Sequence, residues 1–119
     1  MSEEKFDAII VGGGLAGATA AYVLANAGLE VLLADRGDFC GSKNVTGGRL
    51  YGHSMEKVIP GFANEAPIER KVTHEKISPM TEKSSLDIGF SSSKLAEDPE
   101  STSYTILHSK FDAWLAEKC

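Results

Sequence analysis

A glycine-rich stretch near the start of the chain, VGGGLAGATAA at 11–21, follows directly on the apolar run FDAIIV. No charged residue occurs from Ala8 to Leu29, so this span is long enough to be weighed as a membrane-spanning helix. The glycines in its first half argue against that, because each costs about 1 kcal/mol in a helix interior relative to alanine. The preceding residues are mostly acidic, unlike the positive flank of a signal peptide or membrane anchor. We therefore expect no transmembrane segment, but a strand, a tight turn and a helix.

The segment 5–36 is predicted to form one βαβ unit. Residues 6–11 are apolar and β-branched, which is typical of a strand buried on both faces in a parallel sheet. Good helix formers follow over 15–27, and Gly28 ends the helix because glycine readily adopts the left-handed conformation. The second strand, EVLLAD at 30–35, carries an acid at its carboxyl end. Dinucleotide-binding folds are built on such a unit.

The glycines have the GxGxxG spacing of a dinucleotide-binding turn. Gly12 allows a sharp exit from the strand, Gly14 lets backbone N–H groups approach a pyrophosphate, and Gly17 allows close helix–strand packing. The helix N-terminus stabilises the ligand's negative charge. Asp35, about 20 residues further on, can accept hydrogen bonds from a ribose. FAD and NAD sites share this spacing, and Arg36 could serve a 2′-phosphate, brace an adenine or face solvent.

A second glycine-rich stretch, GSKNVTGGRLYGHS at 41–54, carries cations and polar side chains. Together with its backbone donors these suit an anionic or ring-shaped ligand near the first turn. A simple NAD domain would not need such a loop. An ordinary surface connection is the alternative interpretation.

Charge and cysteine content limit the kinds of partner and ligand that we expect. The formal charge of −5, from 17 acidic against 12 basic residues, gives no basic field and argues against nucleic acid. The two cysteines form no CxxC pair, so we expect no metal site. With no signal peptide recognised, this cysteine usage favours a reducing, cytoplasmic setting.

Beyond the second glycine stretch the pattern changes to antiparallel strands. Residues 68–90 alternate apolar and polar positions, which predicts a β-meander inserted after the βαβ unit. Residues 91–102 are polar and contain proline, as in an exposed loop. A strand and a helix follow over 103–119, with Ser109 and Asp112 as a variant capping box. The predicted fold class is α/β, a Rossmann-like βαβ unit followed by a β-meander and a further strand–helix.

Several longer blocks resemble a known family. The blocks are EEKFDAIIVGGGLAG at 3–17, DRGD at 35–38, GSKNVTGGRLYGHS at 41–54, VIPGFANEAPIERKVTHEKIS at 58–78, and SKFDAWL at 109–115. Together they are similar to the FixC-like branch of the electron transfer flavoprotein–quinone oxidoreductase family. The resemblance covers nearly the whole chain except the loop 91–102. KNVTGGRLY, and PGF followed by APIER, are far more specific than the glycine spacing.

The resemblance implies FAD rather than NAD, within the glutathione-reductase-like class of flavoproteins. It implies that the first glycines cradle the pyrophosphate, that Asp35 binds the adenosine ribose, and that 43–48 approach the flavin. It further implies electron transfer from an electron transfer flavoprotein toward quinone, with a ferredoxin-like partner, peripheral to the inner membrane in full-length members. The flavin performs the redox chemistry, so no catalytic side chain is named. The predicted cofactor-binding residues are Gly12, Gly14, Leu15, Ala16, Gly17, Asp35, Arg36, Lys43, Asn44, Thr46, Gly47, Gly48 and His108.

The chain departs from the family pattern at three points. Asp35 stands where the family usually has Glu, which shortens the acceptor by one methylene group. His108 stands where the family typically has Arg, and a histidine is not a permanent cation. The sequence stops at Cys119, whereas the family continues into a second cofactor-binding segment and the quinone region.

Two parallel strands leave edges and faces exposed, so 1–119 is expected to be the N-terminal part of an incomplete FAD-binding domain. We expect such a fragment, or truncated gene product, to be inactive by itself. A bare NAD-binding module and an inactive structural remnant are the alternatives.

Overall fold

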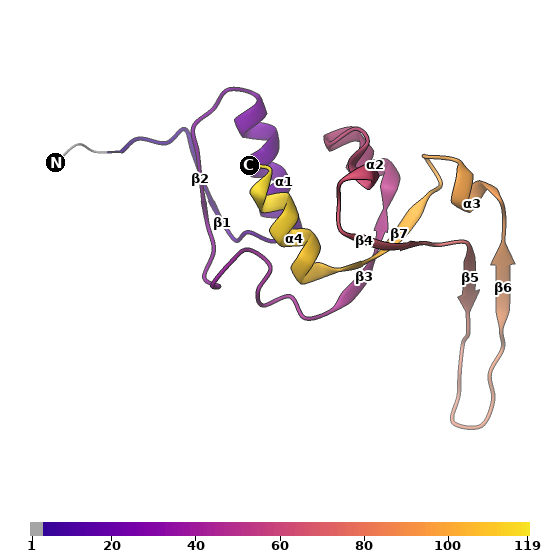
Figure 1. Ribbon diagram of the computed structural model, residues 1–119. Helices are drawn as coiled ribbons and strands as arrows, with labels where there is room; N and C mark the ends of the chain where they lie inside the picture. Colours follow the sequence, from indigo (N-terminus) through magenta and orange to yellow (C-terminus); the bar gives the residue numbers. More distant parts are fainter. Residues whose placement is uncertain (1–3) are drawn as a thin grey trace.

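The computed structural model describes residues 4–119, which form three small sheets and the helices around them (Figure 1). The N-terminal part is the expected βαβ unit, made of β1 (Ala8–Val11), α1 (Leu15–Asn26) and β2 (Val31–Ala34). β1 and β2 pair in parallel, with Ala8 opposite Val31 and Val11 opposite Ala34. After α1 the chain turns at Gly28, whose φ of 85° favours glycine. Among residues 4–119 no helix is long and apolar enough to cross a membrane.

The β1–β2 pair is covered on one face, not on both as expected. α1 packs against one face, and the side chains alternate between half-buried and exposed. Ile9 is 65% exposed and Val11 87% exposed. The continuous apolar run of β1 therefore exceeds what α1 alone can bury.

The second sheet has the strand order β3–β7–β4, with both pairs antiparallel. β7 (Ser103–Leu107) is central, between β3 (Gly47–Tyr51) and β4 (Ile68–Lys71). β3 occupies the second half of the stretch 41–54, which was expected to be a loop. These residues form a strand because they pair with β7, far along the chain, and this pairing turns alternate side chains of β3 toward the interior.

The meander expected over 68–90 is not continuous. β4 pairs with β7, while β5 (His74–Ile77) and β6 (Ile88–Ser91) form a separate hairpin that extends away from the rest (Figure 1). Pairing with β7 places Ile68 against the core, which explains why β4 joins the central sheet. All four residues of β6 are exposed.

Three short helical segments and one longer helix complete the fold. They are α2 (Gly52–Val58), the 3₁₀ turn η1 (Phe62–Asn64), α3 (Lys94–Glu97) and α4 (His108–Glu117). The region 91–102 is therefore not wholly an exposed loop, since it contains α3 and ends in the buried Thr102.

The expected capping box at the start of α4 is wrong. β7 runs straight into α4, so Leu107 occupies the N-cap position and no side chain caps the helix. Asp112 lies inside α4 and is buried. A strand that passes directly into a helix leaves no loop residue free to act as a cap.

One core links the βαβ unit to the central sheet. α1 and α4 lie side by side, and α4 follows directly from β7 (Figure 1). The rings of Phe62 and Tyr104 meet edge to face, with centroids 5.7 Å apart. The buried residues of this core are Ala18, Met55, Ile59, Phe62, Tyr104, Ile106, Phe111 and Leu115.

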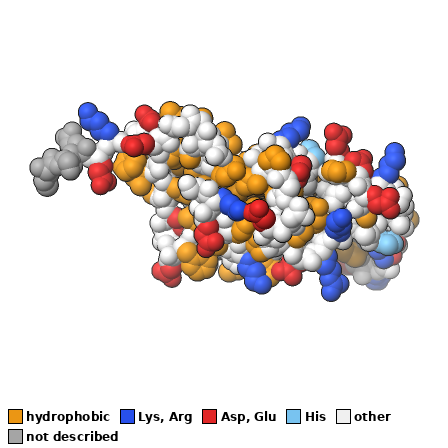
Figure 2. Space-filling view, turned by 45° about the horizontal axis from the view of Figure 1, so that its top comes forward, with side chains coloured by type: hydrophobic (Ala, Val, Ile, Leu, Met, Phe, Trp, Pro, Cys, Tyr) orange, Lys and Arg blue, Asp and Glu red, His pale blue; other side chains and the backbone are white. Residues whose placement is uncertain are grey.

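The described chain is elongated. Its radius of gyration is 18.0 Å, against about 13.5 Å for a compact chain of this length. Apolar side chains appear on the surface over several elements (Figure 2). The core described above is therefore small for the chain's length.

Candidate functional site

The first glycine turn is held by tight backbone contacts. Gly12 donates its N–H to the Ala34 carbonyl over 2.7 Å and has a φ of 106°, which favours glycine. A Cβ on Gly17 would lie 1.8 Å from the Gly12 carbonyl oxygen. Gly12 and Gly17 are thus required by the backbone path itself, because α1 starts directly against the end of β1.

Gly14 differs from these two glycines, because the space next to it is open. It is the N-cap of α1, with φ −76°, and an added Cβ would meet only the Asn44 Nδ2, at 3.8 Å. The first hydrogen bond of the helix runs from Ala18 N–H to the Gly14 carbonyl, and no side chain caps the helix. The N–H groups of Leu15, Ala16 and Gly17 are available to an anion at this end.

Asp35 stands at the end of β2 beside the same turn. Its Oδ1 accepts the Gly37 N–H over 2.7 Å, and its Oδ2 accepts the Gly13 N–H over 2.8 Å. These two hydrogen bonds, that from Gly37 first, lower the pKa of the Asp35 carboxyl group. The carboxylate is therefore ionised near neutral pH, and each oxygen keeps acceptor capacity for a ribose hydroxyl.

A cavity of about 190 Å³ joins the two glycine-rich stretches. The helix N-terminus, two cations and one carboxylate meet around it. Its volume is below the roughly 300 Å³ at which drug-sized ligand sites begin, so it matches a phosphate–ribose portion rather than a whole dinucleotide. Residues lining this cavity, hereafter the cradle cavity, are Gly14, Asp35, Arg36, Gly41, Lys43 and Asn44.

The other predicted residues gather beside the cradle cavity, where β7 meets α4. The His108 N–H donates to the Thr46 carbonyl over 3.1 Å. A Cβ on Gly48 would lie 2.9 Å from His108 Nε2. Gly47 pairs with Leu107 in the sheet. These residues form a group of their own and do not line the cradle cavity.

Three residues near the site were missed as site residues by sequence reasoning. A Cβ on Gly13 would lie 2.2 Å from Cys40 Sγ, so Cys40 packs directly on the turn, and burial raises the pKa of its thiol. Gly41 has a φ of 88° and rests on α4. Asp112 accepts a hydrogen bond from the Asn44 side chain. Gly41 itself was the one sequence signal that the 41–44 turn lies close against another element.

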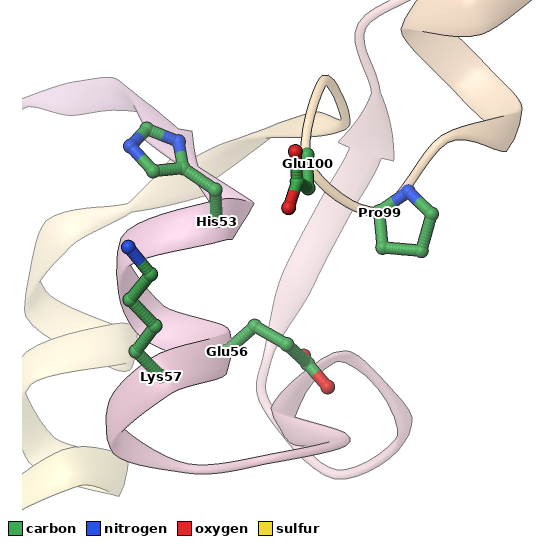
Figure 3. A pocket seen from close by; sticks show the side chains of 5 residues that line it. All are labelled: His53, Glu56, Lys57, Pro99 and Glu100. Atoms are coloured by element: carbon green, nitrogen blue, oxygen red, sulfur yellow. The ribbon is translucent and has the colours of Figure 1, made fainter.

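A larger cavity of about 370 Å³ lies elsewhere, between α2 and the turn after α3 (Figure 3). It is lined by His53, Glu56 and Lys57 of α2 and by Pro99 and Glu100. Glu56 has a structural role there, because its Oε1 accepts the Gly61 N–H over 2.6 Å. We assign the candidate site to the smaller cradle cavity, since it meets the N-terminus of α1, which no side chain caps and which can bind an anion.

The sequence model of the family described as FAD dependent oxidoreductase matches residues 7–98. The chain belongs to the FAD dependent oxidoreductase family. The match includes the whole cradle cavity and confirms FAD, rather than NAD, as the cofactor of the family to which the chain belongs.

Curated relatives of this family member include the Protein FixC of Escherichia coli (strain K12), which is 57% identical over 118 residues. YdiS of the same strain, described as a probable electron transfer flavoprotein-quinone oxidoreductase, is 54% identical. The Protein FixC of Rhizobium meliloti (strain 1021) is 42% identical. Each match covers 99% of this chain and 27% of the relative, so the chain spans about a quarter of their length. The predicted resemblance to the FixC-like branch is confirmed.

A solved structure with a similar fold is the myxobacterial chondrochloren halogenase CndH, described as a variant of FAD-dependent halogenases. The TM-score is 0.70 at 23% sequence identity, over 98% of this chain and 26% of the halogenase. This likeness bears on fold alone and confirms the predicted α/β fold class.

Proposed function

We propose that this chain binds the ADP part of FAD in the cradle cavity, as the N-terminal portion of an FAD-dependent electron-transfer oxidoreductase. The observation that carries the proposal is the meeting of the uncapped N-terminus of α1 with Asp35 and Lys43 around one cavity. A helix N-terminus without a side-chain cap, next to a glycine with free space beside it, can bind a pyrophosphate. An ionised carboxylate can accept hydrogen bonds from a ribose.

In this proposal each residue has one task. The N–H groups of Leu15, Ala16 and Gly17 bind the pyrophosphate, and Asp35 binds the adenosine ribose. Arg36 and Lys43 offset the negative charge. Thr46, Gly47, Gly48 and His108, at the junction of β7 and α4, extend the site toward the flavin. Bound FAD supplies the electron-transfer chemistry, so this segment binds and orients it.

The proposed partners follow from the names of the relatives. YdiS is described as a probable electron transfer flavoprotein-quinone oxidoreductase, and we propose an electron transfer flavoprotein as donor and quinone as acceptor for the full-length protein. A ferredoxin-like partner, as the FixC resemblance implies, is part of the proposal. So is a cytoplasmic location, peripheral to the inner membrane.

The test is flavin binding by the polypeptide that contains these residues. We expect quenching of FAD fluorescence on titration, with NAD competing more weakly than FAD, because NAD shares the ADP part but lacks the flavin. Gly14→Leu places a side chain in open space over the helix end, so it should abolish the quenching while the protein keeps its circular dichroism. Competition by NAD with equal affinity, or binding unaffected by Gly14→Leu, would contradict the proposal.

The electron-transfer part needs a second assay on the full-length protein. Its flavin should be reduced by reduced electron transfer flavoprotein and reoxidised by a soluble quinone. A flavin that binds but accepts no electrons from this donor would leave the cofactor site standing and overturn the proposed partner.

A further inference from the structure

Asp112 is a buried acid that the cofactor-binding roles above do not use. It lies in α4 with 0% of its surface exposed. Its Oδ2 accepts a hydrogen bond from Asn44 Nδ2, while its Oδ1 has no hydrogen-bond partner in the part of the chain described. His108 Nδ1 lies 3.8 Å from that Oδ1. Burying a carboxylate is costly unless donors compensate it, so an acid at this position needs a reason beyond packing.

A second contact joins the same turn to α4. The backbone of Gly41 approaches so closely that an added Cβ would lie 2.7 Å from Asp112 Cβ and 3.0 Å from the Ser109 carbonyl oxygen. The φ of 88° at Gly41 also favours glycine. The chain at 41 therefore rests directly on the helix.

These two contacts with α4, at Gly41 and at Asn44, lie on either side of Lys43. Asn44 N–H donates to the Gly41 carbonyl over 2.9 Å, which closes a turn that has Lys43 near its tip. Lys43 and Asn44 both line the cradle cavity. Asn44 Nδ2 lies 3.8 Å from the position of a Cβ on Gly14, so the same amide is near the N-cap of α1. Both ends of the 41–44 turn are thus fixed on α4 at the mouth of the cradle cavity.

We infer that Asp112 is a positioning residue that fixes the 41–44 turn, through Asn44, at the mouth of the cradle cavity. Its effect on cofactor affinity rests on the proposed function. Its effect on the turn does not, and the two are measured separately.

The first measurement is limited trypsin cleavage after Lys43, made without FAD. Cleavage of a folded protein follows the population of the locally opened state. Asn44→Ala removes the bond from the exposed side of the turn, and Asp112→Ala removes it from the buried side. Both should speed cleavage after Lys43 by about tenfold, the effect of losing one charged hydrogen bond, whereas cleavage after Lys83, in the β5–β6 connection, should not change.

Rescue and control variants separate positioning from general destabilisation. The reciprocal exchange Asn44→Asp with Asp112→Asn rebuilds the bond with donor and acceptor reversed, so it should restore protection at Lys43. Asp87→Ala, an acid removed from the hairpin, should leave cleavage after Lys43 unchanged. If Asp112→Ala unfolds the whole protein, Asn44→Ala and the exchange still test whether the hydrogen bond between Asn44 and Asp112 fixes the turn. Unchanged cleavage in Asn44→Ala, or no rescue by the exchange, would overturn the inference.

The second measurement is the FAD dissociation constant of Asn44→Ala, which should rise several-fold as the turn loosens. If the wild-type protein binds no FAD, the proposed function fails, and the cleavage assay still decides whether Asp112 fixes the turn. If FAD binds wild type and Asn44→Ala equally well, the cofactor site stands and the positioning role is wrong.

Discussion

The side chain of Asp35 accepts a hydrogen bond from the Gly13 N–H over 2.8 Å, so the end of β2 is tied to the turn that ends β1. The acid that the sequence assigns to a ribose therefore also holds the turn that we propose as the pyrophosphate site. Such a preformed turn lowers the ordering cost of binding.

Because the hydrogen bonds to Asp35 lower its pKa, their contribution to stability depends on pH. A carboxyl group with a lowered pKa in the folded state stabilises the protein above its unfolded pKa, near 3.8, and this contribution is lost as pH falls through the lowered value. We expect Asp35→Asn to lower the Tm at pH 7 and to have a smaller effect at pH 3. Thermal melts of both proteins across this range test it. A difference in Tm that is independent of pH would contradict the assignment.

Gly17 is predicted to be intolerant of even one methyl group. A Cβ there would lie 1.8 Å from the Gly12 carbonyl oxygen, and backbone atoms cannot move aside as a flexible side chain can. Gly17→Ala should lower the free energy of unfolding by about 1–3 kcal/mol, as overpacking does. Gly89→Ala is the matched control, since a Cβ at Gly89 meets nothing within 4 Å. Urea denaturation of both variants compares them, and equal effects would show that the close contact does not matter.

The βαβ unit could be predicted from sequence because its signals are local. The apolar run, the GxGxxG spacing and Gly28 each act within a few residues of where they stand, and α1 begins at Leu15 as expected. The pairing of β3 with β7 could not be predicted in the same way. Arg49 lies opposite Thr105, and that register depends on contacts far apart in the sequence.

The part of the candidate site at the first glycine turn, 12–17, could be predicted from the sequence, whereas the contacts of the 41–44 turn could be predicted less well. Lys43 and Asn44 were identified from residue type and from the family resemblance, and both line the cradle cavity. Asp112 was interpreted as the partner of Ser109 in a variant capping box, yet α4 starts earlier, at His108, and Asp112 is buried. Only the packing of α4 against the 41–44 turn shows what this acid contacts.

Arg49 joins the central sheet to the β5–β6 hairpin. Its Nη2 lies 2.6 Å from Glu75 Oε1, and its Nε donates to Ser103 Oγ over 2.9 Å. The hydrogen bond from Arg49 lowers the pKa of Glu75. Both side chains are about a third exposed, so the pair should contribute little and be screened by salt.

We therefore expect Glu75→Gln to lower the Tm slightly at low ionic strength and not at all in about 1 M salt, where the Debye length is about 3 Å. Asp87→Asn removes the charge of Asp87, whose ion pair with Lys76 is more exposed than the Arg49–Glu75 pair, so it should have a smaller effect. Scanning calorimetry at two salt concentrations provides the measurement. An effect of Glu75→Gln that persists undiminished in high salt would mean that packing, not charge, joins the hairpin to the sheet.

His108 offers a gain-of-affinity test. It stands beside Gly48, and its Nδ1 lies 3.8 Å from the Oδ1 of buried Asp112, which has no hydrogen-bond partner among residues 4–119. An arginine at 108 would bring a permanent cation with several donors, enough to pair with Asp112 and still face an anionic cofactor. We expect His108→Arg to tighten FAD binding by about three- to tenfold, in line with one added charge-assisted hydrogen bond.

The control for this variant is His53→Arg, which makes the same change at the larger cavity beside α2 and should not alter the FAD dissociation constant. Fluorescence titration at pH 7 compares the three proteins. Unchanged affinity in His108→Arg would remove His108 from the cofactor-binding residues. Position 108 would then serve only the junction of β7 and α4, where its N–H donates to the Thr46 carbonyl.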